Sequence, residues 1–288
     1  MHTGMVPSSQ IGRASLAALF GTLMAIACGT PTFAEDAQPK AVFDKEKSQS
    51  AGLGMPSPLD KFLAIDIVLK GKVNWKKAYT ENSEKLDPDK FTDKEVGIPL
   101  ALGIRIADGV MAVKAHDAEL LNQCANDIEK LAKQMGIADS ELRRARDVRE
   151  AANRGEWLRV FMDLAFFQQD IMRLIKTGEN ETRGTLLIAA GWIQGARYTS
   201  KVILADYSPE LSNILREPLL AKALIAEVAA LPPQLQKNPQ VAHLRDDVLP
   251  LVYSIVNVKI DEPITRDRLI ALEKTATQFV RKAVQKTK

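Results

Sequence analysis

Residue types that often mark a catalytic, metal-binding or nucleic-acid-binding site are scarce in this chain. Its 288 residues include two cysteines, three histidines and 6% aromatic residues, and its formal net charge is only +3. So small a charge gives no basis for nucleic-acid binding, which requires a dense positive surface. Because Cys28 falls in the amino-terminal leader described below, Cys124 has no partner for an internal disulfide, and stability must come from core packing.

The sequence patterns of metal, nucleophilic and nucleotide sites are missing as well. There is no H-E-x-x-H, no C-x-x-C-H, no G-x-S-x-G and no Walker or dinucleotide-binding fingerprint. His116 and His243 lie far apart in the sequence, and we expect His116 to end a helix rather than to bind a metal ion. The sequence therefore predicts no metal, no cofactor and no enzymatic activity.

Residues 1–34 have the parts of a secretory signal peptide. Arg13 carries the only charged side chain before Glu35, and an apolar stretch over residues 14–27 follows it. Small and turn-forming residues come next and end at Ala34. The apolar stretch is too short for a comfortable membrane span. We therefore expect cleavage near Ala34 and a periplasmic or secreted protein.

A second interpretation keeps the chain on a membrane. Cys28 follows Ala-Ile-Ala at residues 25–27, a partial match to the pattern that precedes a lipidated cysteine. A lipoprotein anchor at Cys28 would carry a diacyl group and an amide-linked acyl chain. It would hold the protein on a membrane stably, whereas a single acyl chain binds only marginally. Under either interpretation, residues 35–57 are polar and rich in Ser, Gly and Pro, which predicts a flexible linker ahead of a helical domain over 58–288.

Almost every segment from residue 58 onward has the apolar periodicity of a helix and residues that begin or end one. The pattern Thr92-x-x-Glu95 predicts a capping box for a helix that runs to about residue 115. We expect irregular structure over 72–91 and 259–264, a division at Pro218 and a kink or break at Pro250. Further expected helix caps are Asp117, Ser208, Asn238 and Thr265. The prediction is an all-α bundle of eight or nine helices.

Two of the predicted helices, over residues 96–113 and 184–196, are apolar nearly all round. A helix of this kind is enclosed by other helices. Small residues recur four apart in each, which lets helix backbones approach closely. They are Gly103 and Ala107 in the first helix, and Gly191, Gly195 and Thr199 in and just after the second. Aligning Gly103 with Gly191 suggests two pseudo-repeated halves, 58–178 and 179–288; the alternative is that buried helices resemble one another.

The apolar helices contain charged residues that need partners. Arg105 stands three residues before Asp108, and Asp66 lies on an apolar face of the preceding helix. A buried charge without a partner is costly, so we expect Arg105 to pair with Asp108, Asp66 or both. Three alternatives remain for these residues. They form a structural ion pair, they line a pocket in which Arg105 binds an anionic ligand, or they are exposed on the surface. Gln194 and Arg197 occupy a comparable place in the second apolar helix and leave the same alternatives open.

Two further expectations concern core packing. Cys124 shares one helical face with several leucines, which predicts a buried thiol of low reactivity. Trp157, Phe161, Phe166 and Phe167 are predicted to pack in the core.

The segments GIRIADGVMAVKAHD and GWIQGARYTSKVILADYSPELSNILREP resemble those of uncharacterised exported helical proteins of bacteria. The resemblance covers roughly residues 60–255. It implies export and an all-α fold, and it assigns no functional residue.

These observations favour an exported cell-envelope protein that acts without catalysis, as a scaffold or adaptor bound to a protein partner or to a second copy of itself. The alternative is a periplasmic protein that binds a small anionic ligand or a lipid in a pocket between the central helices, near Arg105, Asp108 and Asp66. Nucleic acid is not an expected partner.

Overall fold

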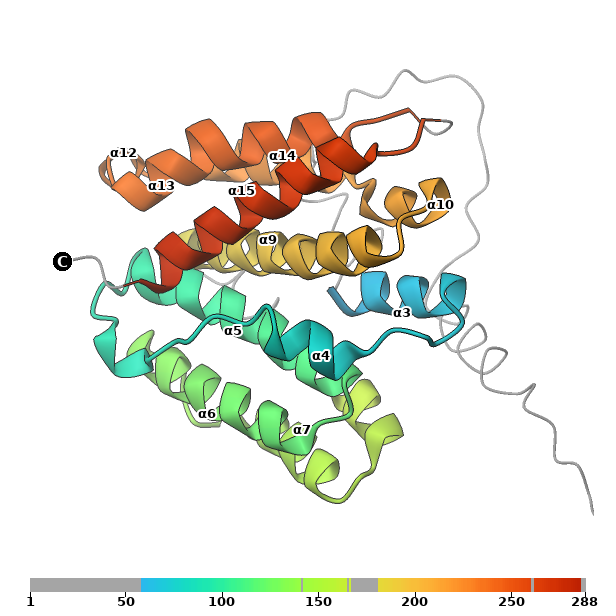
Figure 1. Cartoon of the computed structure of the whole chain (residues 1–288). Helices are drawn as coiled ribbons and strands as arrows, with labels where there is room; N and C mark the ends of the chain where they lie inside the picture. Colours follow the sequence, from blue (N-terminus) through green and yellow to red (C-terminus); the bar gives the residue numbers. More distant parts are fainter. Residues whose placement is uncertain (1–57, 141, 165, 167–180, 260–261, 286–288) are drawn as a thin grey trace, which may run out of the picture. The chain divides into compact units, whose positions relative to one another are not determined.

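The computed structural model describes residues 58–288, except 141, 165, 167–180, 260–261 and 286–288 (Figure 1). The predicted signal peptide over 1–34, the lipidation candidate Cys28 and the linker over 35–57 lie outside the described residues. Within the described part of the chain every regular element is helical, so the all-α prediction is confirmed.

The helices follow one another with short connections. Their number exceeds the eight or nine expected, because short helices such as α4 and α12 form where the sequence predicted irregular structure or a single helix end. A further helix over 157–164 follows α7. In chain order the elements are α3 (Pro58–Val68), α4 (Trp75–Thr80), η1 (Pro88–Lys90), α5 (Gly97–Lys114), α6 (Ala118–Gln134), α7 (Arg143–Asn153), α9 (Glu181–Ala205), α10 (Pro209–Ser212), η3 (Asn213–Leu215), α11 (Pro218–Ala229), α12 (Pro233–Gln236), α13 (Pro239–His243), η4 (Leu244–Val248), α14 (Leu249–Val256) and α15 (Arg266–Val284).

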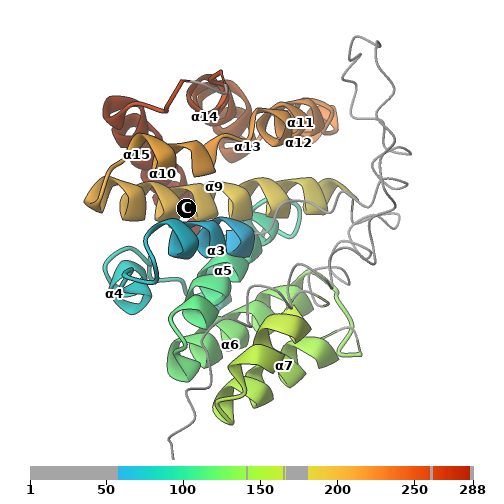
Figure 2. The same ribbon diagram turned by 90° about the vertical axis from the view of Figure 1, so that its right-hand side faces the viewer.

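The two all-round apolar helices, α5 and α9, cross in the middle of this unit. Figures 1 and 2 show α6 and α7 on one side of the crossing and α13, α14 and α15 on the other. At the crossing the backbones touch, since a Cβ added to Gly103 would lie 2.0 Å from the carbonyl oxygen of Leu187. Gly191 faces Gly103 from the other helix. The predicted close approach through small residues is therefore confirmed at this pair.

The two central helices pack against different outer helices. The helix α5 packs against its sequence neighbour α6, whereas α9 packs against the carboxyl-terminal helix α15. The helix α14 packs against α11 and α15. The predicted duplication into halves 58–178 and 179–288 stays a prediction, and the two central helices do not use equivalent partners.

Side-chain caps begin four of the helices that the sequence placed. Asp117, Ser208, Asn238 and Thr265 each accept a hydrogen bond from a backbone N–H of the first helical turn, as predicted. The capping box at Thr92 is wrong. The side chain of Asp93 instead accepts from the N–H groups of Glu95 and Val96, and α5 starts at Gly97.

The region over 239–256 runs as one helical path, because a π-helical turn, Leu244–Val248, joins α13 to α14. Pro250 lies at the start of α14, just after this wider turn. Proline lacks a backbone N–H and crowds the preceding turn, so a π turn is a natural place to accommodate it. The expected disturbance at Pro250 thus takes the form of a widened turn rather than a break.

Candidate functional site

Arg105 and Asp108, one turn apart on α5, form a buried ion pair. Arg105 Nη1 donates to Asp108 Oδ2 at 3.0 Å, and the two side chains are 7% and 1% exposed. Arg105 Nη2 lies 2.9 Å from Asp127 Oδ2 on α6. Two carboxylates therefore compensate the charge of one buried guanidinium, and the pairing predicted for Arg105 and Asp108 is confirmed.

Asp108 also ties α5 to α9. Its Oδ1 accepts a hydrogen bond from Gln194 Nε2 at 2.7 Å and another from the Tyr198 hydroxyl at 2.8 Å. Complete burial raises the pKa of Asp108, while the charge of Arg105 and these two hydrogen bonds oppose that rise. Burial together with Asp108 also raises the pKa of Tyr198, so the phenol stays protonated and keeps donating.

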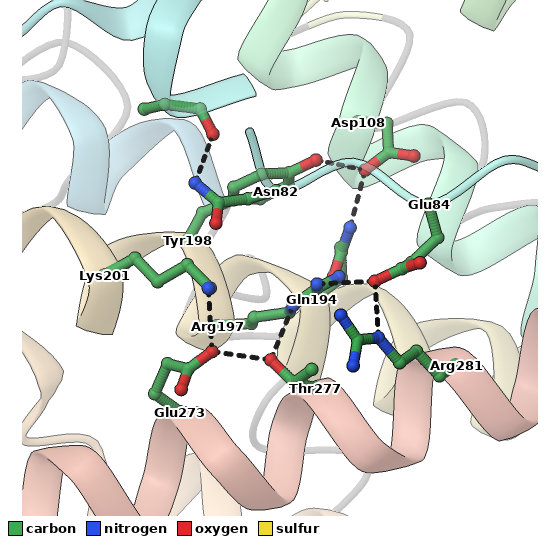
Figure 3. A network of polar contacts seen from close by, with 11 residues as sticks. Asn82, Glu84, Asp108, Gln194, Arg197, Tyr198, Lys201, Glu273, Thr277 and Arg281 are labelled. Carbon is green, nitrogen blue, oxygen red and sulfur yellow. Dashed lines mark hydrogen bonds and ion pairs between the residues drawn. The ribbon is translucent and has the colours of Figure 1, made fainter. Parts of the chain in front are cut away.

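Arg197 on α9 is the second buried guanidinium, at 1% exposure. Its Nε donates to Thr277 Oγ1 at 2.9 Å, its Nη2 donates to Glu84 Oε1 at 2.7 Å, and its Nη1 lies 3.5 Å from Gln194 Oε1. Figure 3 shows Arg281 reaching the same Glu84 oxygen from α15, at 3.1 Å. Gln194 thus joins the Arg197 contacts to the Asp108 contacts, and we call the whole set the central network.

The central network continues toward solvent through α15. The Thr277 hydroxyl donates to Glu273 Oε1 at 2.6 Å, and Lys201 Nζ lies 3.0 Å from the same carboxylate oxygen (Figure 3). Contacts within single helices alternate with contacts between helices, and the contacts between helices fasten α5 to α6 and α9, and α9 to α15.

Asp66 does not belong to the central network, so of the two partners expected for Arg105 the structure shows Asp108 and not Asp66. Its Oδ1 accepts a hydrogen bond from Trp75 Nε1 at 2.8 Å, and its Oδ2 forms an ion pair with Lys114. Asp66 lies near the carboxyl-terminal end of α3, where it faces the last turn of α5 rather than its middle. Of the five candidate residues, the structure brings four together and leaves Asp66 apart.

The central network has the chemistry of a structural fastening. Its guanidinium groups and carboxylates point at one another, and the α5–α9 backbones touch beside them at Gly103. Arg105 Nε is a buried nitrogen with no hydrogen-bond partner among the described residues. With its charges already matched, the network offers an incoming anion little free positive charge.

A hollow of about 410 Å³ lies elsewhere, where the segment after α3 meets the last turn of α5. Its lining mixes ammonium groups with two aromatic rings and small side chains. The residues are Lys72, Val73, Asn74, Trp75, Lys76, Lys114, Ala115 and His116. His116 ends α5, as predicted, in a left-handed conformation at φ 51°.

Cys124 is buried beneath α4, as predicted. Its Sγ lies 3.3 Å from the Tyr79 hydroxyl, and the residue is 0% exposed. Burial and the negative charge of Asp108 raise the pKa of the Cys124 thiol to about 12, against a weaker lowering by the Tyr79 hydrogen bond. The thiol is therefore protonated and unreactive in the folded protein.

The helix that begins at residue 157 has apolar side chains on two faces. Val160 is buried in the core, whereas Leu158, Met162 and Phe166 are 59%, 47% and 47% exposed. Their spacing of four places these three on one side of the helix, which we call the outer apolar face. The predicted core position of Phe166 is wrong, and Phe167 lies outside the described residues.

Several residues of the central network could not be found from the sequence. Asp127, Tyr198 and Thr277 lie on amphipathic or apolar helices, where a polar side chain at one position has many alternative explanations. Glu84 comes from the segment over 81–87, which has no regular pattern. A search for polar residues on the apolar face of each helix would have found Thr277 and Tyr198, but not that they contact Arg197 and Asp108.

Comparison of the chain with protein-family models, with curated proteins and with solved structures gives no match. In the part of the chain that the structure describes, no helix is long and apolar enough to cross a membrane. Among the same residues, no three His, Cys, Asp or Glu side chains gather as a metal site would require.

Proposed function

We propose that this chain is an exported cell-envelope protein that acts without catalysis, by holding a protein partner on its outer apolar face. The observation behind the proposal is the exposure of Leu158, Met162 and Phe166 along one side of a single helix. Large apolar side chains grouped on a surface and rimmed by polar residues are typical of interaction sites. Lone exposed apolar residues, in contrast, need no such explanation.

The rim of the outer apolar face favours a protein over an anionic membrane. Arg159 lies 3.5 Å from Glu156 and 3.4 Å from Asp163, so its charge is shared with two carboxylates. Arg144 lies over the Phe166 ring, with 5.3 Å from its guanidinium carbon to the ring centroid. A rim of mixed sign around an apolar centre matches the usual anatomy of a protein–protein interface.

The central network supports a scaffold rather than a catalyst. Its buried ionised groups pair with one another. A catalytic group, in contrast, must lie within hydrogen-bond reach of a substrate. A rigidly fastened bundle presents its surface helices in a fixed arrangement, which lowers the entropy cost of binding a partner.

The proposal includes export through the leader over residues 1–34, with cleavage near Ala34. The alternative is a lipoprotein held through Cys28. The mass of the intact protein from its own host distinguishes the two, because one product starts at Glu35 and the other carries acyl chains on Cys28. A chain that retains residues 1–34 unmodified in the cytosol would contradict both.

A photo-crosslinking amino acid at Met162 tests the interface in intact cells. We expect one discrete crosslinked product there, and its loss when Leu158→Gln is added. The matched control is the same crosslinker at Leu219, which is 74% exposed on α11 in the opposite layer. Twice the monomer mass identifies a second copy as the partner. Equal products at Met162 and Leu219, or none at Met162, would refute this interface.

A ligand-binding alternative is favoured by a different observation, the hollow beside His116. Touching backbones at Gly103 and Gly191 and the matched charges of the central network argue against a ligand between α5 and α9. The hollow is open to solvent and has its own charged groups, so we place ligand binding there.

A further inference from the structure

The hollow beside His116 gathers three ammonium groups in a small volume. Lys72 comes from the segment after α3, Lys76 from the first turn of α4, and Lys114 from the last turn of α5. Two helix ends and one turn are therefore needed to bring the three side chains together. Like charges repel, so such a cluster needs a negative group nearby.

Two carboxylates supply part of that negative charge. Asp66 pairs with Lys114, whose side chain is only 9% exposed and whose Nζ lies 5.7 Å from the Trp75 ring centroid. Asp117 Oδ2 lies 2.7 Å from Lys76 Nζ, and this contact raises the pKa of Lys76. Neither carboxylate belongs to the lining of the hollow.

Lys72 has no ion-pair partner among the residues that the structure describes, and it is exposed. Lys76 and Lys114 are thus paired, whereas the ammonium group of Lys72 stands in the lining without a carboxylate partner among the described residues. The carboxylates fix two of the ammonium groups from outside, so those groups are oriented before any ligand arrives, which lowers the cost of binding.

His116 adds a neutral polar group at the edge of the hollow. Burial and the neighbouring charge of Lys114 lower its pKa, with Asp66 opposing them, so the ring is uncharged near neutral pH. The ring stacks on Trp157 at a centroid distance of 4.9 Å and an angle of 14°. A neutral imidazole has one N–H donor, and stacking holds it in place.

We propose that this hollow binds the phosphate group of a small molecule or lipid, held by Lys72, Lys76 and Lys114 with His116 at the rim. The chemistry of the lining favours phosphate over a carboxylate. Planar carboxylates are typically recognised by the fork of an arginine, and the lining contains none. Ammonium groups act as point charges and suit a tetrahedral anion approached from several sides. This inference does not depend on the outer apolar face.

Calorimetric titration of inorganic phosphate into the full chain, in a chloride buffer of low ionic strength, tests the proposal. We expect Lys72→Ala and Lys76→Ala each to raise the phosphate Kd about tenfold, as for the loss of one charged hydrogen bond. The control is Lys77→Ala. Lys77 neighbours Lys76 and is 67% exposed, but it is not part of the lining. It should bind phosphate as the unmodified chain does, and thermal melting checks that all variants fold.

Vesicles of phosphatidylglycerol, compared with vesicles of phosphatidylcholine, identify the source of the phosphate. Vesicle binding that Lys72→Ala abolishes and Lys77→Ala preserves indicates an anionic lipid headgroup. Phosphate binding without vesicle binding indicates a soluble phosphorylated molecule. The proposal is overturned if phosphate shows no saturable binding, or if all three variants weaken it equally.

Discussion

Two regions of α5 contain charged side chains that serve different purposes. In the middle of the helix, Arg105 and Asp108 are buried and their charges are matched within the central network. At its last turn, Lys114 belongs to a group of three ammonium side chains, of which Lys72 has no ion-pair partner among the described residues. Burial forces the charges in the middle to be balanced, because an uncompensated charge there would lower the free energy of unfolding by several kcal/mol, about 3–5 when one partner of a buried pair is removed. At the surface, water tolerates an imbalance that a ligand can use.

The largest expected difference is between removing a carboxylate from a buried ion pair and removing one from an exposed ion pair. We expect Asp108→Asn to lower the free energy of unfolding by about 3–5 kcal/mol, because it breaks a buried ion pair and turns an amide NH2 group toward side chains that themselves donate hydrogen bonds. Glu81→Gln removes the partner of Lys77 from an exposed pair and should cost about 1 kcal/mol or less. Urea denaturation measures both. If Asp108→Asn costs no more than Glu81→Gln, the central network is not what fastens the helices.

The close crossing beside the central network can be broken without touching a charge. Gly103→Ala places a methyl group against the Leu187 carbonyl, and we expect a loss of about 3 kcal/mol or more. In Gly109→Ala the new methyl lies 3.6 Å from the nearest atom, Ile128 Cδ1, an ordinary contact. Alanine favours a helix over glycine, so this control should be neutral or stabilising by up to about 1 kcal/mol. Equal melting temperatures for the two variants would disprove the tight crossing.

The backbone at the carboxyl-terminal end of α5 is strained at His116, and the expected effect is smaller than that of Gly103→Ala. His116 closes the helix in the left-handed conformation that Gly136 and Gly155 adopt after α6 and α7. His116→Gly and His116→Ala both remove the ring from Trp157, but only glycine adopts this conformation freely. We expect His116→Gly to be more stable than His116→Ala by about 1 kcal/mol, measured by thermal unfolding. An alanine variant as stable as the glycine variant would show that the conformation relaxes.

The smallest expected effect is a pH dependence at the same residue. Burial and Lys114 depress the pKa of His116 below its usual 6.5 in the folded chain, so the unfolded chain takes up the proton more readily. The stability that His116 contributes is present above about pH 6.5 and falls as the pH drops through the folded pKa. Comparing melting temperatures at about pH 8 and about pH 5, we expect a slightly smaller acid loss in His116→Gly. An identical loss in both chains would rule out this contribution.

Local signals in the sequence predicted much of the fold. Helix periodicity and the caps at Asp117 and Ser208 act within one or two turns, so their consequences can be read from neighbouring residues. The spacing of small residues around Gly103 and Gly191 is also local, and it predicted a close approach of helices. The same reasoning missed α4, because six residues give too few apolar positions to show a period.

The candidate site was less predictable because its contacts join distant parts of the chain. Arg105 and Asp108 are three residues apart and were paired correctly. Arg197 meets Glu84 across 113 positions and Thr277 across 80, which no local pattern encodes. Phe166 shows the converse difficulty, since an aromatic residue on an amphipathic helix has the same sequence pattern whether its face is covered or left open.

The position of Cys124 has a practical consequence. Its thiol is sealed under α4 and kept protonated, so a thiol reagent can modify it only when that layer of the bundle opens. The modification rate in the native protein therefore measures the free energy of a local opening rather than of complete unfolding. Cys124 is thus a built-in probe of local opening at α4, although its role in the folded protein is that of a small apolar side chain.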